Sequence, residues 1–475
     1  MSIYLDHNAT TSVDPDVLAA MLPFFTETFG NPSSKHGPGE VAAMAVQKAR
    51  AQVQSLLGAD YPHEIMFNSG GTESVNSAIV SALESAPLRR EMIISAIEHS
   101  AVRTLADWLA KNKGIRVHTI PVDKNGRIDV VAYKEALSER VAVVSMMWAN
   151  NETGTILPVV ELAEMAKEVG AVFHTDAVQA VGKIPIDLKA TEIDMLSLSG
   201  HKLHAPKGVG ALYLRKGLRF RPQIKGGHQE RGRRAGTENV PGIVALGKAA
   251  ELAGERMEAD AEYLKPLRAK LEAGLREIPN AYIVAADNDR LPNTTSVAFD
   301  YIESESILLL LDKEGIAGSS GSACSSGSFE PSHVLQAMSV PETAVRGAVR
   351  FSLSRENTEA RSIACSTYCR ASSRNCARFL LTGRQAIRPR RRAPMLDRPT
   401  TPLPVVLNDT TLRDGEQRRV WLLAWRKSWR SPRRSPMPAF RRSRSARLPW
   451  VRKKSPLFAR SSRRACPRRR SPGAA

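Results

Sequence analysis

The stretch Met195-Leu196-Ser197-Leu198-Ser199-Gly200-His201-Lys202 decides the fold class of this chain. A short apolar run, typical of a buried strand, ends in small and polar residues and then presents one lysine. Such a lysine, if partly buried, has a lowered pKa and acts as an amine nucleophile. A cofactor with a carbonyl group, held as a Schiff base, is its natural partner. The alternative is a surface lysine after a strand, since most lysines are exposed.

A second apolar run, Val172-Phe173-His174-Thr175-Asp176, ends in an acid. A pyridoxal phosphate enzyme needs a carboxylate against the pyridine nitrogen, because a protonated ring accepts electrons from the substrate. Ligands of open α/β sheets bind at the carboxyl ends of strands. Two strand ends that carry Asp176 and Lys202 would therefore bring both groups to one cleft.

A glycine-rich turn, Ser69-Gly70-Gly71-Thr72, separates a predicted strand at 64–68 from a predicted helix at 75–86. Glycines let backbone N–H groups approach an anion, and a helix N-terminus carries partial positive charge, so the pattern is that of a phosphate cradle. On its own the pattern also fits an ordinary turn. Further alternation, with a strand at 141–147 and a helix at 159–169, predicts a mostly parallel sheet with helices on both faces.

With these motifs in order, the chain resembles the cysteine desulfurases of the nitrogen-fixation type, which are pyridoxal phosphate enzymes of the aspartate-aminotransferase-like fold. The resemblance runs from Tyr4-Leu5-Asp6-His7-Asn8-Ala9-Thr10-Thr11 to Arg350-Phe351-Ser352-Leu353-Ser354-Arg355. It implies an α/β fold of type I with a large domain at 15–256. A smaller α+β domain would comprise 1–14 and 257–360, beginning with a charged helix near 259–278.

The resemblance also implies the residues of the site. His99 would stack on the pyridine ring and carry a proton, and Arg350 would bind the substrate carboxylate as a bidentate clamp. Thr237 would bind the phosphate of the partner subunit's cofactor, which implies a homodimer. The remaining residues that would hold pyridoxal 5'-phosphate are Gly71, Thr72, Asn151, Asp176, Gln179, Ser199, Gly200, His201 and Lys202.

One cysteine lies among serines and glycines in the stretch 318–328, Cys324. Such a stretch has little apolar surface to pack, which favours a reactive thiol on a mobile loop over a buried structural cysteine. The resemblance implies that Cys324 takes the sulfur of L-cysteine as a persulfide while L-alanine leaves. The sulfur would pass to an iron–sulfur scaffold protein, with Cys324 as a candidate metal ligand through its persulfide. A selenocysteine lyase or another class-V transaminase relative is the alternative within enzymes.

The charge of the chain is divided unevenly. Residues 361–475 hold 28 Arg and 3 Lys against 4 acidic residues, so this segment carries +27 and residues 1–360 carry −7 of the total of +20. The first 360 residues therefore have no bias toward nucleic acid. Only one of the five cysteines lies among them, which argues against a disulfide framework. With no signal peptide or spanning apolar run recognised, the expected compartment is the cytoplasm.

The segment 361–475 departs from the family. It is rich in Arg, Ser and Pro, it shows no apolar period, and we expect it to be disordered. Residues 405–417 resemble the start of homocitrate synthase, and only 58 residues follow them, far below the roughly 250 of a barrel enzyme. A disturbed reading frame explains both facts, and a homocitrate synthase start just downstream favours the supply of nitrogenase clusters as the role. The alternative is a natural basic tail that binds nucleic acid or an anionic membrane.

Overall fold

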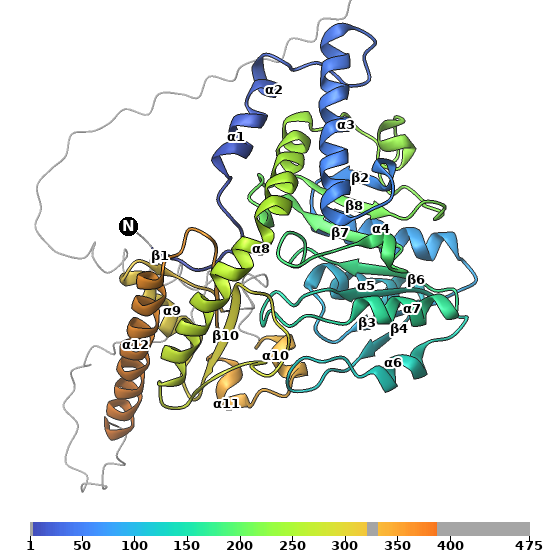
Figure 1. Ribbon diagram of the computed structural model, residues 1–475. Helices are drawn as coiled ribbons and strands as arrows, with labels where there is room; N and C mark the ends of the chain where they lie inside the picture. Colours follow the sequence, from blue (N-terminus) through green and yellow to red (C-terminus); the bar gives the residue numbers. More distant parts are fainter. Residues whose placement is uncertain (1–2, 321–330, 387–475) are drawn as a thin grey trace, which may run out of the picture. The chain divides into compact units, whose positions relative to one another are not determined.

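A seven-stranded sheet is the largest sheet of the computed structural model, which describes residues 3–320 and 331–386 (Figure 1). All of its strands except β8 run in the same direction. The fold is therefore α/β, as the sequence predicts. In spatial order the strands are β2 (Ile65–Asn68), β8 (Gly210–Leu214), β7 (Met195–Ser199), β6 (Val172–Asp176), β5 (Val141–Met147), β3 (Glu91–Ser95) and β4 (Arg116–Ile120).

Helices cover both faces of this sheet because its strands are apolar on both sides. Along β3, Ile93 belongs to one core, while Met92 and Ile94 belong to another on the opposite face. The second of these cores is completed by α4 (Gly71–Ser85) and α5 (Ser100–Lys113). The first is completed by α3 (Gly37–Leu57), α7 (Val159–Glu168) and the N-terminal part of α8 (Val240–Arg276).

A separate core surrounds two small sheets. Strands β12 (Val349–Ser352), β10 (Thr294–Phe299) and β9 (Ala281–Ile283) form one, and β1 (Ile3–Tyr4) pairs with β11 (Ile316–Ala317) in the other. Further short elements complete the described chain: α1 (Pro15–Met21), α2 (Pro23–Thr26), η1 (Pro62–Glu64), α6 (Val130–Ala136), η2 (Leu188–Ala190), η3 (Gly200–Lys202), η4 (Gln229–Gly232), α9 (Ser304–Lys313), α10 (His333–Ala337) and α11 (Glu342–Val345).

The helix α8 corrects one expectation. A separate helix near 259–278 was predicted, but α8 runs without a break from Val240, across the expected domain boundary at 256, and contains Pro266. Its first residues are buried against the large sheet's core, and its last turns are buried in the separate core. Tertiary packing at both ends thus favours a helix longer than the one predicted near 259–278. The domain division itself remains a prediction.

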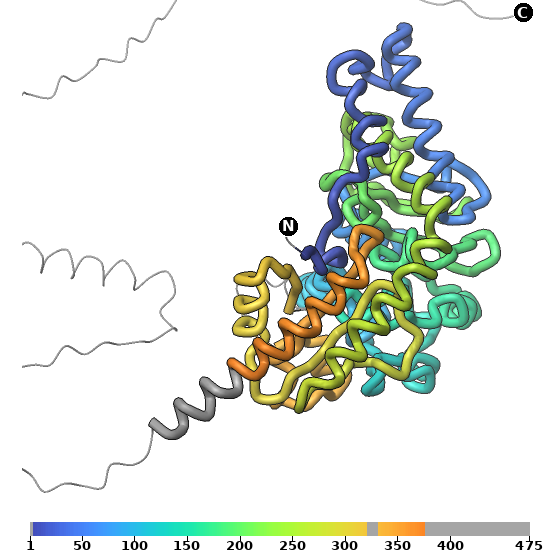
Figure 2. The backbone as a smooth tube through the Cα atoms, turned by 60° about the vertical axis from the view of Figure 1, so that its left-hand side comes forward, coloured from blue at the N-terminus to red at the C-terminus, as the bar shows by residue number. Residues whose placement is uncertain are grey.

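A second correction concerns the segment after residue 360. It was expected to lack a helical period, but α12 spans Glu359–Ala386 and runs beside α8 (Figure 2). Its buried face consists of small residues at helical spacing, among them Ser362, Cys365 and Cys369. Small side chains allow a close approach: a Cβ added to Gly274 of α8 would lie 2.4 Å from Ser366 Oγ. A search for a Leu or Ile stripe misses such a face. Residues 387–475 lie outside the described residues.

Candidate functional site

The carboxyl edge of the large sheet gathers most of the predicted site residues. Asp176 is the last residue of β6, Ser199 is the last of β7, and Lys202 follows in η3. These strands are adjacent and parallel, so the two strand ends meet at one edge. Asn151 follows β5, and His99 follows β3 as the N-cap of α5. The sheet therefore brings together groups that lie about 100 residues apart in sequence.

Asp176 is 6% exposed, and its carboxylate accepts a hydrogen bond from the Val178 N–H at 3.0 Å. Burial raises its pKa, while the charges of His99 and Lys202 act in the opposite direction. His99 Nδ1 accepts from the Ala101 N–H at 3.1 Å, which leaves the ring proton on Nε2. A protonated pyridine nitrogen placed against Asp176 would thus meet a buried carboxylate.

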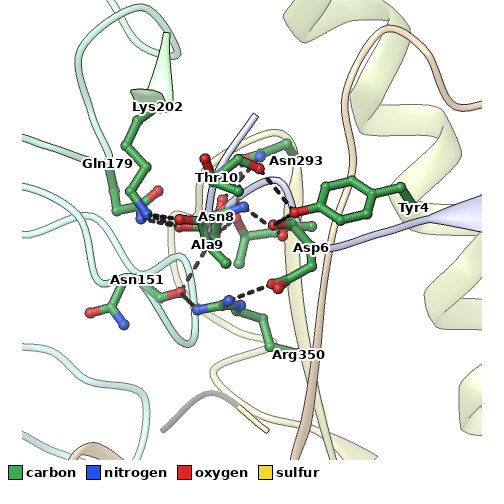
Figure 3. Close-up of polar contacts among 12 residues, drawn as sticks. Tyr4, Asp6, Asn8, Ala9, Thr10, Asn151, Gln179, Lys202, Asn293 and Arg350 are labelled. Atoms are coloured by element: carbon green, nitrogen blue, oxygen red, sulfur yellow. Dashed lines mark hydrogen bonds and ion pairs between the residues drawn. The ribbon is translucent and has the colours of Figure 1, made fainter. Parts of the chain in front are cut away.

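Lys202 is held by the N-terminal segment. Its Nζ donates to the backbone carbonyls of Asn8 and Ala9, the latter at 2.8 Å (Figure 3). The neighbouring His201 accepts, through its carbonyl, from both the N–H and the hydroxyl of Thr11 at 3.0 Å. Burial and the charge of Lys202 lower the pKa of His201 to about 4, so its ring is neutral at pH 7. The residues Asn8 to Thr11 therefore pack directly on η3.

Asn8 links this edge to the smaller sheets, and sequence reasoning did not single it out. It is 1% exposed, and its side-chain oxygen accepts from Lys183 Nζ at 3.3 Å and Asn293 Nδ2 at 3.2 Å. Its side-chain nitrogen donates to the carbonyl of Asn151 at 3.3 Å and to Thr294 Oγ1 at 2.9 Å. One amide thus joins two segments of the large sheet to the segment that leads into β10.

Gln179 and Lys183 lie next to Asn8. Gln179 Nε2 donates to the Asn8 carbonyl at 3.0 Å, and Lys183 Nζ donates to Gln179 Oε1 at 2.8 Å. Lys183, which was not predicted as a site residue, has its pKa lowered to about 7 by burial and by the charges of Lys202 and Arg350. Its hydrogen bond fixes the orientation of the Gln179 amide. The only sequence signal for Lys183 is its place one helical turn after Gln179.

The glycine turn lies against the end of β7. Gly70 has φ +145, a conformation that favours glycine, and a Cβ there would lie 3.5 Å from Ser199 Oγ. A Cβ on Gly71 would meet Val178 at 2.8 Å and the Ser199 Cβ at 3.7 Å. The N-terminus of α4, with Thr72 exposed in its first turn, therefore faces Ser199. Gly200 is buried, and a Cβ there would lie 3.1 Å from the Val209 carbonyl oxygen.

Arg350 lies on β12 and is 3% exposed. Its Nη2 forms an ion pair with Asp6 Oδ1 at 2.6 Å, and its Nη1 donates to the Asn151 carbonyl at 2.9 Å (Figure 3). The side-chain amide of Asn151 points away from Arg350. The guanidinium thus reaches the same carboxyl edge from the smaller sheet, on the other side of the N-terminal segment from Lys202.

One predicted residue of the described chain, Thr237, is not brought to the strand ends. Thr237 is exposed on the loop that follows η4. The segment of η4 and this loop is fixed to α3 by the buried pair of Arg50 and Glu230 at 2.8 Å, and to α4 by an ion pair of Arg234 with Glu73 at 3.0 Å. Cys324, and with it the predicted persulfide and metal ligand, lies outside the described residues.

The residues present fit pyridoxal phosphate on three counts. Asp176 supplies a buried carboxylate, Lys202 supplies an amine just after the next strand, and the α4 N-terminus supplies backbone N–H groups beside Ser199. A Cβ at Gly71 would fill part of that cradle, which explains the glycine there. Among the described residues, no cluster of three or more His, Cys, Asp or Glu side chains could hold a metal ion.

The model of the aminotransferase class-V family matches residues 3–361, about three quarters of the sequence. The chain belongs to this family. It is 62% identical over 360 residues to a cysteine desulfurase of Gluconacetobacter diazotrophicus, an alignment that covers 76% of this chain and 90% of that protein. It is 60% identical over 358 residues to the cysteine desulfurase NifS of Azotobacter vinelandii, covering 75% and 89% of the two chains.

Solved structures agree with this assignment. A NifS-like protein superposes with a TM-score of 0.73 at 41% identity, covering 78% of this chain and 99% of that one. The structure described as SspA in complex with cysteine superposes with a TM-score of 0.67 at 34% identity, covering 75% and 100%. The recognition of the family and of its fold is therefore confirmed. No helix of the described part combines the length and apolarity needed to cross a membrane.

Proposed function

We propose that this protein is a pyridoxal-phosphate-dependent cysteine desulfurase, which converts L-cysteine to L-alanine and retains the sulfur. The observation that carries this proposal is that Asp176 ends β6 while Lys202 follows the end of the adjacent parallel strand β7, with Arg350 buried at the end of the smaller sheet. The names of its relatives, at up to 62% identity, support the same reaction. The class-V aminotransferase and cysteine desulfurase families depend on pyridoxal phosphate, so the cofactor is the expected one.

The cofactor would be held by groups from five strand ends, those of β2, β3, β5, β6 and β7. Asp176 would face the pyridine nitrogen, Asn151 and Gln179 the phenolic oxygen, and His99 the ring. The phosphate would be held by Gly71, Thr72, Ser199, Gly200 and His201, joined by Thr237 of the partner subunit. When bound, pyridoxal phosphate supplies a carbonyl group for the substrate amine and a ring that accepts the electron pair left at the substrate Cα.

The protein's own groups carry protons and fix the substrate. Lys202 Nζ, held by the Asn8 and Ala9 carbonyls, would move the Cα proton. His99 carries a proton on Nε2, because Nδ1 accepts from Ala101, and would serve as a second proton carrier. Arg350 would bind the substrate carboxylate and so present the same face of every substrate molecule to Lys202.

The sulfur would be taken up by Cys324. Its thiolate forms a bond to the substrate sulfur while the bond between sulfur and Cβ breaks. The electron pair of that bond goes to Cβ, which takes a proton, so that L-alanine leaves and a persulfide remains. We infer that this persulfide serves iron–sulfur cluster assembly through a scaffold protein in the cytoplasm, and that the enzyme is a homodimer. These last inferences rest on the family resemblance and on the exposure of Thr237.

Borohydride reduction tests the role of Lys202. The purified full chain should be yellow, and reduction should fix the cofactor covalently to Lys202, as mass spectrometry of peptides would show. Lys202→Ala should lose this attachment. Lys207→Ala, five residues away and exposed, is the matched control and should keep it. A borohydride-stable attachment in the Lys202→Ala protein would refute the assignment.

A further inference from the structure

The guanidinium proposed to bind the substrate carboxylate already has a carboxylate partner within the chain. Arg350 Nη2 and Asp6 Oδ1 are 2.6 Å apart, and their side chains are 4% and 18% exposed. Among the residues that the structure describes, Arg350 contacts only one oxygen of Asp6, and Arg350 Nε is buried without a hydrogen-bond partner. The contact is therefore a single charge-assisted bond that leaves part of the guanidinium unused.

The backbone on both sides holds this pair in place. Asp6 forms an isolated bridge with Ser352, the His7 N–H donates to the Ser352 carbonyl at 3.3 Å, and the Ser352 N–H donates to the Leu5 carbonyl at 2.8 Å. Tyr4 adds a bond from its hydroxyl to the Asp6 carbonyl at 3.2 Å (Figure 3). The backbone of Asp6 is thus fixed beside Ser352, which lies two residues after Arg350 on β12. Little conformational freedom remains to be lost when the ion pair forms.

A second carboxylate at Arg350 would lie close to the first. Two carboxylates on one buried guanidinium repel each other strongly because the surroundings screen the charges poorly. The nearby cations Lys183 and Lys202 reduce this repulsion but are themselves held by Gln179 and by the Asn8 and Ala9 carbonyls. An arriving substrate therefore has to displace Asp6 from Arg350 or tolerate its charge.

We propose that Asp6 is a built-in competitor for the carboxylate site of Arg350, and that it weakens the binding of α-carboxylate substrates and products. The proposal rests on the proposed function, because it takes Arg350 as the carboxylate site. Its consequence is release: a product whose carboxylate competes with Asp6 leaves more readily than one bound to an unpaired arginine. Asp6 also pairs with the buried guanidinium between turnovers. Without Asp6, the positive charge of Arg350 would be left without a counter-charge whenever no substrate is bound.

The test is equilibrium binding to the cofactor-loaded full chain, measured by calorimetry with L-alanine and with L-alaninamide, which lacks the carboxylate. Asp6→Asn should bind L-alanine at least about fivefold more tightly than the parent protein, since it removes one like charge from the site. Binding of L-alaninamide should change by less than about twofold. Asp6→Ser should behave as Asp6→Asn does, and it decides the matter if Asp6→Asn does not fold.

Two controls make the result specific. Asp6→Glu keeps the charge and should match the parent within about twofold. Asp16→Asn removes a carboxylate from an exposed ion pair with Arg256 and should change neither affinity. Equal or weaker binding of L-alanine by both neutral Asp6 variants would overturn the proposal while leaving the desulfurase function intact. Failure of the parent protein to bind L-alanine and to make alanine from L-cysteine would overturn both.

Discussion

Asn8→Ala removes a buried amide that joins four partners, and its cost follows from the geometry. The variant loses the hydrogen bonds to Lys183, Asn293, Asn151 and Thr294, at 2.9 to 3.3 Å. A net hydrogen bond contributes about 0.5–1.5 kcal/mol, and a buried group left bare costs more. Each partner keeps another bond, such as that of Lys183 to Gln179, so the lower half of the range applies. Four such losses predict a decrease of about 3 kcal/mol in the free energy of unfolding.

Urea denaturation of the full chain, followed by circular dichroism at pH 7, measures this decrease. Asn112→Ala is the matched control, since Asn112 is exposed and its amide bonds only to the Trp108 carbonyl at 2.9 Å among the described residues. The control should change the stability by less than about 0.5 kcal/mol. A loss below about 1 kcal/mol for Asn8→Ala would refute the view that Asn8 ties the two sheets together.

Three buried ionisable groups predict how stability depends on pH, each measurable by urea unfolding. Burial raises the pKa of Glu98 to about 8, so the parent should lose stability as the pH rises from about 5 to about 8, and Glu98→Gln should remove that loss. Burial lowers the pKa of His174 to about 3, so the stability of the parent should decrease by about 2 kcal/mol as the pH falls from 7 to 5. His174→Gln should lose this dependence on pH. Lys183, with a pKa of about 7, should make the parent gain stability between pH 7 and 10, a slope that Lys183→Met should lose. Parallel pH curves for a variant and its parent would contradict the corresponding prediction.

The residues at the strand ends could be predicted because the apolar strand, the turn after it and the reactive side chains lie close together in the sequence. The apolar run of β7 predicts a buried strand. The site residues Ser199 to Lys202 follow from that strand alone, without knowledge of any distant part of the chain. The glycine turn is local in the same way, since Gly70 adopts a backbone conformation that side chains rarely allow. The order of strands and the parallel direction then place Asp176 beside them.

The contacts of the N-terminal segment could not be predicted in this way. Asp6 meets Arg350 across 344 residues, and Asn8 meets Thr294 across 286. No apolar period or turn signal marks such pairs, because polar bonds of this kind depend on the finished fold. The face of α12 was missed for a different reason: it is made of Ser and Cys, which pack only because Gly274 of α8 allows a close approach.

Alanine formation from L-cysteine in a single turnover tests the central claim most directly. The cofactor-loaded parent protein should form L-alanine and retain sulfur as a persulfide on Cys324, detected by mass spectrometry. Cys324→Ala should still bind the cofactor and change its absorbance with L-cysteine, but it should form essentially no alanine. A variant in which Cys365, Cys369, Cys376 and Cys466 are all replaced by serine should retain the reaction. Alanine formation by Cys324→Ala at the parent rate, or none by the parent, would contradict the account.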